Sequence, residues 1–218
     1  MTSMRTLGLS MITTIAVCAG VAASASAALP EFVPSPAPFT VKSGATTMET
    51  TSKAKIVCAA DTGVGEVMGP KTGTAQLVLT GCEFVTLSLP CMSVGRPPGE
   101  VVTASLLMTL GYINTPKKEV GIDLSTATGG PLMEFVCGAL RVLVSGSVIG
   151  KITPVNKLVA PPGHFILKFT QAAGKQKPPK FELGPIDVPS MSFGGPFIES
   201  GLTSTETVAF PIGMMIAA

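Results

Sequence analysis

The stretch VVTASLLMTLGYI, residues 101–113, decides between a helical and a β-sheet architecture for this chain. Its length alone would suit a helix. However, residues 101–103 are all β-branched, Gly111 interrupts the stretch, and short strand-like runs lie on both sides of it. We therefore expect one long strand here, or two strands joined by a bend.

Strand-like runs recur at short intervals in both directions from this stretch. Residues 119–124 (EVGIDL) alternate between apolar and polar side chains, as a strand with one buried face requires. Neither a βαβ rhythm nor a repeat of fixed period is found. The sequence predicts an all-β fold, an antiparallel β-sandwich or barrel-like domain. Its further strands are expected at 54–60, 74–80, 83–89, 132–137, 140–149, 165–169, 181–188 and 206–216.

The composition excludes two broad classes of protein. Of the 218 residues, 46% are hydrophobic and 13% are charged, whereas a typical soluble domain has roughly a quarter charged residues. A disordered chain would be poor in apolar residues and rich in charge. The formal charge is only +2, and its lysines and arginines are scattered, so we expect no nucleic-acid partner.

The N-terminal segment has the pattern of a secretory signal peptide. Arg5 supplies the positive charge, residues 7–23 form the apolar stretch, and Ala25-Ser26-Ala27 is a cleavage site of small residues. We expect residues 1–27 to be removed, residues 28–38 to be a loosely held proline-rich lead-in, and residues 39–218 to form a single β domain. The mature protein should then be secreted, extracellular or at the cell envelope, without a transmembrane helix.

Four cysteines remain after the signal peptide, and they indicate two disulfides in an exported protein. Four cysteines allow three pairings, and sequence alone does not choose between them. We favour the two pairings that join cysteines near in sequence. A zinc site is not expected, because the cysteines lie far apart with no histidine beside them, and no cofactor is expected either. The favoured pairs are Cys58 with Cys82 and Cys91 with Cys137.

The triplet Asp61-Thr62-Gly63 is the sharpest catalytic candidate. Aspartic proteases place such a triplet so that two aspartates share one proton and activate water. A second triplet is absent from the sequence, so only a homodimer could supply the partner aspartate. The favoured interpretation is a β-turn in which Asp61 accepts backbone hydrogen bonds.

Other titratable residues give weaker signals. His164 is the only histidine, follows Pro161-Pro162-Gly163, and is expected at an exposed turn. One histidine cannot build a multi-histidine metal site. Glu66, Glu100 and Glu119 could pair as glycosidase carboxylates do, but any chain with 13 acidic residues offers such pairs.

A dispersed set of residues between 58 and 176 resembles a known family. The set comprises Cys58, Gly65-Glu66, Gly81-Cys82, Cys91-Met92-Ser93, Gly99-Glu100-Val101, Thr103, Leu110-Gly111-Tyr112, Val120-Gly121, Cys137, Gly146-Ser147-Val148-Ile149-Gly150, Pro154-Val155-Asn156-Lys157 and Gln171. It resembles a family of uncharacterised secreted proteins from high-GC soil actinobacteria. That family has no established activity, so the resemblance implies export, paired cysteines and a β fold, and nothing catalytic.

The sequence favours a non-enzymatic binding or structural β domain that acts by surface contact on an extracellular or envelope partner, and it allows a homo-oligomer. Low charge and high apolar content predict exposed apolar patches, which usually mark partner surfaces. One alternative is a secreted hydrolase that uses Asp61-Thr62-Gly63. Another is an envelope pore-forming β oligomer, against which the absence of Trp and the single Tyr count.

Overall fold

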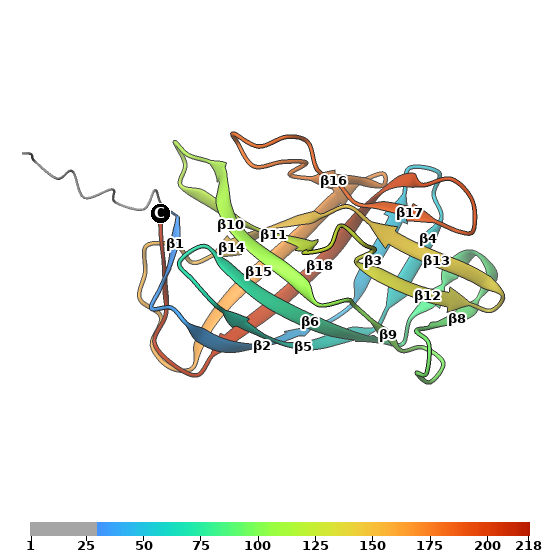
Figure 1. The fold of residues 1–218 in the computed structure, drawn as a ribbon, viewed down its shortest axis with the longest axis horizontal. Coiled ribbons are helices and arrows are strands. Elements are labelled where there is room, and N and C mark those ends of the chain that lie inside the picture. Colours follow the sequence, from blue (N-terminus) through green and yellow to red (C-terminus); the bar gives the residue numbers. More distant parts are fainter. Residues whose placement is uncertain (1–29) are drawn as a thin grey trace, which may run out of the picture.

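The computed structural model describes residues 30–218, which form an almost entirely β fold (Figure 1). The expected signal peptide lies outside these described residues. A single 3-10 turn, η1 (Val85–Leu87), is the only helical element between residues 30 and 218. No helix in this range has the length and apolar character needed to cross a membrane.

Eight antiparallel strands close into a barrel. Each strand pairs with the next around the circuit, and the last, β6, pairs back to β10. In circuit order the strands are β10 (Leu106–Asn114), β11 (Glu119–Thr126), β14 (Val148–Thr153), β15 (Gly163–Ala172), β18 (Ile198–Phe210), β2 (Ala37–Ser43), β5 (Ala60–Val67) and β6 (Thr72–Thr80). We call this circuit the main barrel.

Shorter strands close a second circuit at one end of the main barrel, on the right in Figure 1. The long strand β18 belongs to both circuits. Residues 198–203 of β18 pair within the second circuit, and residues 204–210 pair within the main barrel. The other members of this small ring are β3 (Thr46–Thr50), β4 (Lys55–Cys58), β7 (Glu83–Phe84), β8 (Leu89–Met92), β12 (Met133–Cys137), β13 (Leu140–Ser145) and β17 (Ser190–Ser192).

The interior of the main barrel is filled by apolar side chains from alternate positions of its strands. On β2, Ala37, Phe39 and Val41 are buried, while the residues between them are exposed. The ring of Phe210 packs against Phe39 and Phe165, with centroid separations of 5.5 and 5.7 Å. An eight-stranded barrel is just wide enough for such side chains to fill it.

A two-stranded sheet lies at the end of the main barrel opposite the small ring (Figure 1). It pairs β1 (Glu31–Val33) with β19 (Met215–Ala217), and Phe32 and Ile216 are buried there. Part of the proline-rich lead-in is therefore hydrogen-bonded into the fold instead of being loosely held. The remaining strands are β9 (Val101–Val102), which pairs with β6, and β16 (Lys175–Lys177), which pairs with β15.

Both disulfides lie in or beside the small ring. They join Cys58 to Cys82 and Cys91 to Cys137, so the favoured pairing is confirmed. The strands of this ring other than β18 have two to six residues, whereas those of the main barrel have six to thirteen. Short strands bury little apolar area, and covalent links restrict the unfolded chain where packing alone is weak.

The all-β prediction is confirmed, and closed circuits replace the sandwich alternative. Residues 101–113 form two strands, β9 and β10, as one of the two expectations had it. Several local expectations are wrong. The 3-10 turn η1 interrupts residues 83–89, and residues 211–214 separate β18 from β19 within the expected strand 206–216. Residues 140–149 are split between β13 and β14 by Gly146 and Ser147, residues 181–188 form a loop, and Asp61-Thr62-Gly63 lies within β5.

Candidate functional site

Asp61 points into the fold from the beginning of β5. It is 2% exposed, and β5 continues beyond it with β2 paired on one side and β6 on the other. The predicted β-turn is therefore wrong. Gly63, two residues on, faces the same way, and the Leu77 side chain occupies the space that a side chain at residue 63 would need. The triplet is thus one inward carboxyl, one outward threonine and one inward glycine of a barrel strand.

Hydroxyl groups surround one oxygen of the Asp61 carboxyl. The Ser43 hydroxyl donates to Asp61 Oδ2. Thr46 Oγ1 lies 2.9 Å from the same oxygen and 3.0 Å from Ser204 Oγ, so its single proton serves one of these acceptors at a time. These hydroxyls leave the other oxygen, Asp61 Oδ1, buried without a donor.

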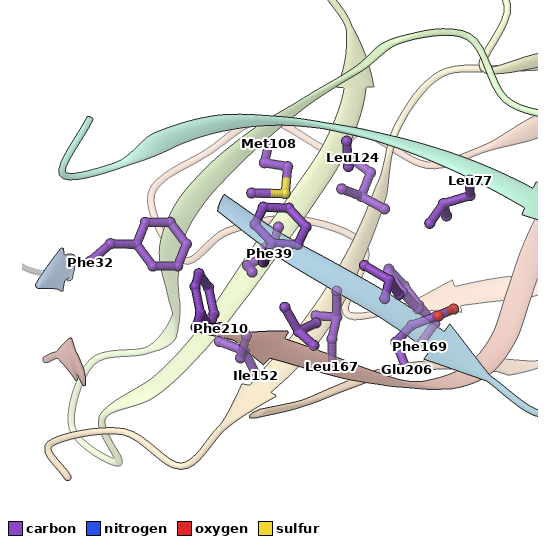
Figure 2. A pocket seen from close by; sticks show the side chains of 14 residues that line it. Phe32, Phe39, Leu77, Met108, Leu124, Ile152, Leu167, Phe169, Glu206 and Phe210 are labelled. Atoms are coloured by element: carbon purple, nitrogen blue, oxygen red, sulfur yellow. The ribbon is translucent and has the colours of Figure 1, made fainter. Parts of the chain in front are cut away.

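Glu206 is the second buried carboxyl at this place. It lies on β18 beside Ser43 of β2, and it is 3% exposed. Ser204 donates a hydrogen bond of 2.8 Å to Glu206 Oε1, while Glu206 Oε2 is buried without a donor. Figure 2 shows Glu206 next to Phe169, at the end of the barrel interior away from Phe32.

The two carboxyls are hydrogen-bonded to each other when one of them carries a proton. Burial, the hydrogen bond with Asp61 and the charge of Asp61 raise the pKa of Glu206 to about 8. Two ionised carboxylates can only accept, so Asp61 Oδ1 and Glu206 Oε2 would then have no donor. We refer to Asp61 and Glu206 as the carboxyl pair. With its pKa raised to about 8, Glu206 carries a proton at neutral pH.

The carboxyl pair is sealed inside the protein. It borders a cavity of about 50 Å³, most of whose lining is leucine, methionine, valine and phenylalanine side chains. Binding pockets for small molecules typically measure about 300–1,000 Å³. A proton-sharing pair of carboxyls is also found in aspartic proteases, but this cavity has no room for a peptide.

The other titratable candidates are not brought together. Glu66 is exposed on the outer face of β5, Glu100 pairs with Arg96 at 3.0 Å, and Glu119 pairs with Lys151 at 2.7 Å. His164 is exposed as expected, although it lies in β15 and not at a turn. Within residues 30–218, no three His, Cys, Asp or Glu side chains are grouped so as to hold a metal ion.

One further carboxyl has an altered environment. Burial raises the pKa of Asp123 on β11 to about 6, a nearby Ser147 hydroxyl opposes this shift, and the charge of Asp187 adds to it. Ser147 is 1% exposed in the connection between β13 and β14. Asp123 is on the outside of the barrel wall and does not line the cavity beside the carboxyl pair.

An open groove of about 680 Å³ lies where three connections meet on the surface. Its lining comes from the segments after β8, between β9 and β10, and between β11 and β12. Ala104, Ser105, Ala127 and Thr128 are exposed there. Among the lining residues, all in the described part of the chain, Glu134 alone is charged, and its carboxylate pairs with Arg141 at 2.7 Å. We call this surface the neutral groove.

No family model, no curated protein and no solved structure matches this chain. The carboxyl pair and the neutral groove must therefore be interpreted from their own chemistry.

Sequence analysis missed Glu206, although a signal for it exists. Ser204, Glu206, Val208 and Phe210 occupy alternate positions of one strand, so the period of two places them on one face. Because Val208 and Phe210 are strongly apolar, that face is the buried one. A glutamate on it is the kind of buried polar residue that needs a specific partner.

Proposed function

We propose that this chain is an exported, non-enzymatic binding domain, and that the neutral groove is its contact surface for an extended, uncharged segment of another protein. The open groove lined by small uncharged side chains carries this proposal. Ala104, Ser105 and Ala127 leave room for a ligand backbone, and the groove has no cluster of basic residues that would select phosphate or nucleic acid.

The two disulfides support the export part of the proposal. Disulfides persist in oxidising compartments, namely outside the cell, in the periplasm or at the cell surface. They lie in or beside the small ring, and the segment after β8 that helps to line the neutral groove begins two residues after Cys91. A stapled framework next to the groove would reduce the entropy that binding loses.

The packed interior supports a surface function over a pore. A channel needs a polar lumen, whereas the inward side chains here are mostly phenylalanine, leucine, isoleucine and valine. The unoccupied space within the main barrel next to Phe39 and Phe210 amounts to about 30 Å³. This leaves the outer surface as the place for recognition.

The test uses a random peptide library displayed on phage and selected on the full, oxidised protein. We expect the recovered peptides to be poor in charged residues. They should bind wild type but lose at least tenfold in affinity to Ala104→Trp and to Ala127→Trp, which fill the neutral groove. The matched control is Ala139→Trp, at an alanine that is also exposed but lies in the β12–β13 turn outside the groove. Peptides that bind all four proteins equally would refute the groove as the contact surface.

A secreted hydrolase is the second candidate, and the carboxyl pair is the observation that favours it. Proton-sharing carboxyls can activate water, but the sealed cavity of about 50 Å³ beside this pair would first have to open to admit a peptide. This version predicts peptide cleavage with an acid optimum that Asp61→Asn abolishes. The binding version predicts no cleavage and unchanged peptide affinity in Asp61→Asn, so one variant separates the two functions.

A further inference from the structure

We propose that the carboxyl pair is a one-proton lock that fastens the main barrel to the small ring, and that losing its proton loosens this junction. The occupant of the site is a proton and not a metal ion. The lock is separate from the neutral groove and does not depend on the binding function proposed above.

The carboxyl pair lies where the chain passes from one circuit to the other. Of the several passages between the circuits, three border the pair. The first of these is between Ser43 of β2 and Thr46 of β3, and the second is between Cys58 of β4 and Ala60 of β5. The third is within β18, where the partner of the strand changes from β3 at Thr203 to β15 at Ser204. Asp61 and Glu206 are fixed to two of these passages, so a bond between them ties the circuits together.

At this junction the donated hydroxyl protons do not satisfy all the buried carboxyl oxygens. The hydroxyls of Ser43, Thr46 and Ser204 donate to Asp61 Oδ2 and Glu206 Oε1. Asp61 Oδ1 and Glu206 Oε2 are both buried without a donor. A single proton held between these two oxygens satisfies both, and an unsatisfied buried polar atom would otherwise cost stability.

No cation is available to replace that proton from within the described residues. The side chains around the pair from β6, β10, β11, β14 and β15 are apolar, and the remaining polar neighbours are the hydroxyls of Ser43, Thr46, Thr103 and Ser204. The charged residues and the histidine of the adjoining strands are on the outer face, namely Lys42, Glu49, Glu66, Glu119, Asp123, Lys151, His164, Lys168 and Glu199. Two ionised carboxylates here would be uncompensated buried charges.

The direction of the pH effect follows from proton counting. The pKa of Glu206 is raised from 4.5 to about 8 in the folded protein, so the folded state holds more protons than the unfolded state between these pH values. The stabilisation is complete below about pH 4.5 and is lost as the pH rises through about 8. Asp123 also has a raised pKa, but it is ionised above about pH 6, which leaves pH 6–8 to the carboxyl pair.

The experiment follows urea unfolding of the oxidised protein from pH 5 to pH 9. We expect the wild-type unfolding constant to rise by up to about tenfold per pH unit between pH 6 and 8, the slope for one proton. Glu206→Gln, whose amide donates to Asp61 at every pH, should lose this rise. Glu66→Gln, an exposed glutamate on the strand that carries Asp61, should keep the wild-type slope.

Two further measurements keep the proposal testable if Glu206→Gln does not fold. Carboxyl carbon NMR of the wild-type protein should show Glu206 titrating well above the usual glutamate range. Hydrogen exchange at the Thr46 and Ser204 amides should lose protection over the same pH interval, after correction for the base-catalysed rise of the intrinsic exchange rate. A Glu206 titration in the ordinary range, or an unchanged slope in Glu206→Gln, would overturn the proton lock. So would destabilisation by a chelator that added calcium reverses, because that result would indicate a cation at the site.

Discussion

The ring of Phe39 occupies the space that a side chain at residue 65 would fill. An ideal Cβ placed on Gly65 would overlap both the Phe39 ring and the backbone oxygen of Thr74. Gly65 faces the barrel interior from β5, directly opposite Phe39 of β2 in the strand pairing. The glycine therefore allows the largest kind of core side chain to lie across the narrow interior.

Gly65→Ala should be destabilising for this reason. We expect a loss of about 1–3 kcal/mol, the usual range for overpacking a core, measured by urea unfolding at fixed pH. The control is Gly44→Ala, because a Cβ at Gly44 meets nothing within 4 Å. A Gly65→Ala protein as stable as the control would contradict the packing assigned to Phe39.

Removing either disulfide should lower the stability of the protein by destabilising the small ring. One double variant changes Cys58 and Cys82 to alanine, and the other changes Cys91 and Cys137 to alanine. Each should lower the free energy of unfolding by about 2–4 kcal/mol, measured by calorimetry. The Cys91–Cys137 bridge spans 46 residues and the Cys58–Cys82 bridge spans 24. A near-doubling of loop length adds about 0.6 kcal/mol, so the first bridge should contribute slightly more. Hydrogen exchange measures the loss of amide protection in each circuit. An equal loss in the main barrel and in the small ring would argue against a local effect on the small ring.

Asp123→Asn should stabilise the protein at neutral pH. The pKa of Asp123 is raised from 3.8 to about 6, so the folded state favours the protonated form, and its stabilisation is lost as the pH rises from about 3.8 through 6. Asparagine carries no charge that burial could penalise, so we expect a gain of about 1 kcal/mol at pH 7 and none at pH 3. Urea unfolding at both pH values checks this, and a gain of equal size at pH 3 would contradict the electrostatic cause.

The groove substitutions should leave the fold intact. Ala104 and Ala127 are exposed, and substitutions at exposed positions usually change stability by less than about 0.5 kcal/mol. Thermal unfolding of Ala104→Trp and Ala127→Trp should therefore match wild type within that margin. A larger loss of stability in either variant would mean that its weaker peptide binding results from unfolding. The peptide affinity of the milder variant Ala104→Leu would then be compared with that of wild type.

Export should remove the first 27 residues. Expression of the full chain in a secreting host, followed by intact-mass measurement under oxidising conditions, should give a protein that begins at Ala28 and contains no free thiol. Ala25→Phe together with Ala27→Phe removes the small residues that signal peptidase requires, so this variant should retain its N-terminal segment. Normal processing of that variant would place the cleavage elsewhere.

The sequence alone determined the class of the fold and the position of many strands. Alternation in residues 119–124 and the β-branched start of residues 101–103 depend on local chemistry, and the structure has β11 and β9 there. The pairing of Cys58 with Cys82 and of Cys91 with Cys137 was favoured because of short loops, which is also a local argument. The signal peptide and the exported state stay predictions from sequence.

Only the tertiary structure decided what Asp61 does. Its neighbours in sequence suggested a turn or half of a protease site, whereas its partners Ser43, Thr46 and Glu206 reach it through strand pairing. The closure of two circuits around a shared β18 is likewise a property of long-range register, which no local pattern encodes. The sequence determines the chemical type of each side chain, but the pKa and the partners of a side chain depend on which distant strands bury it.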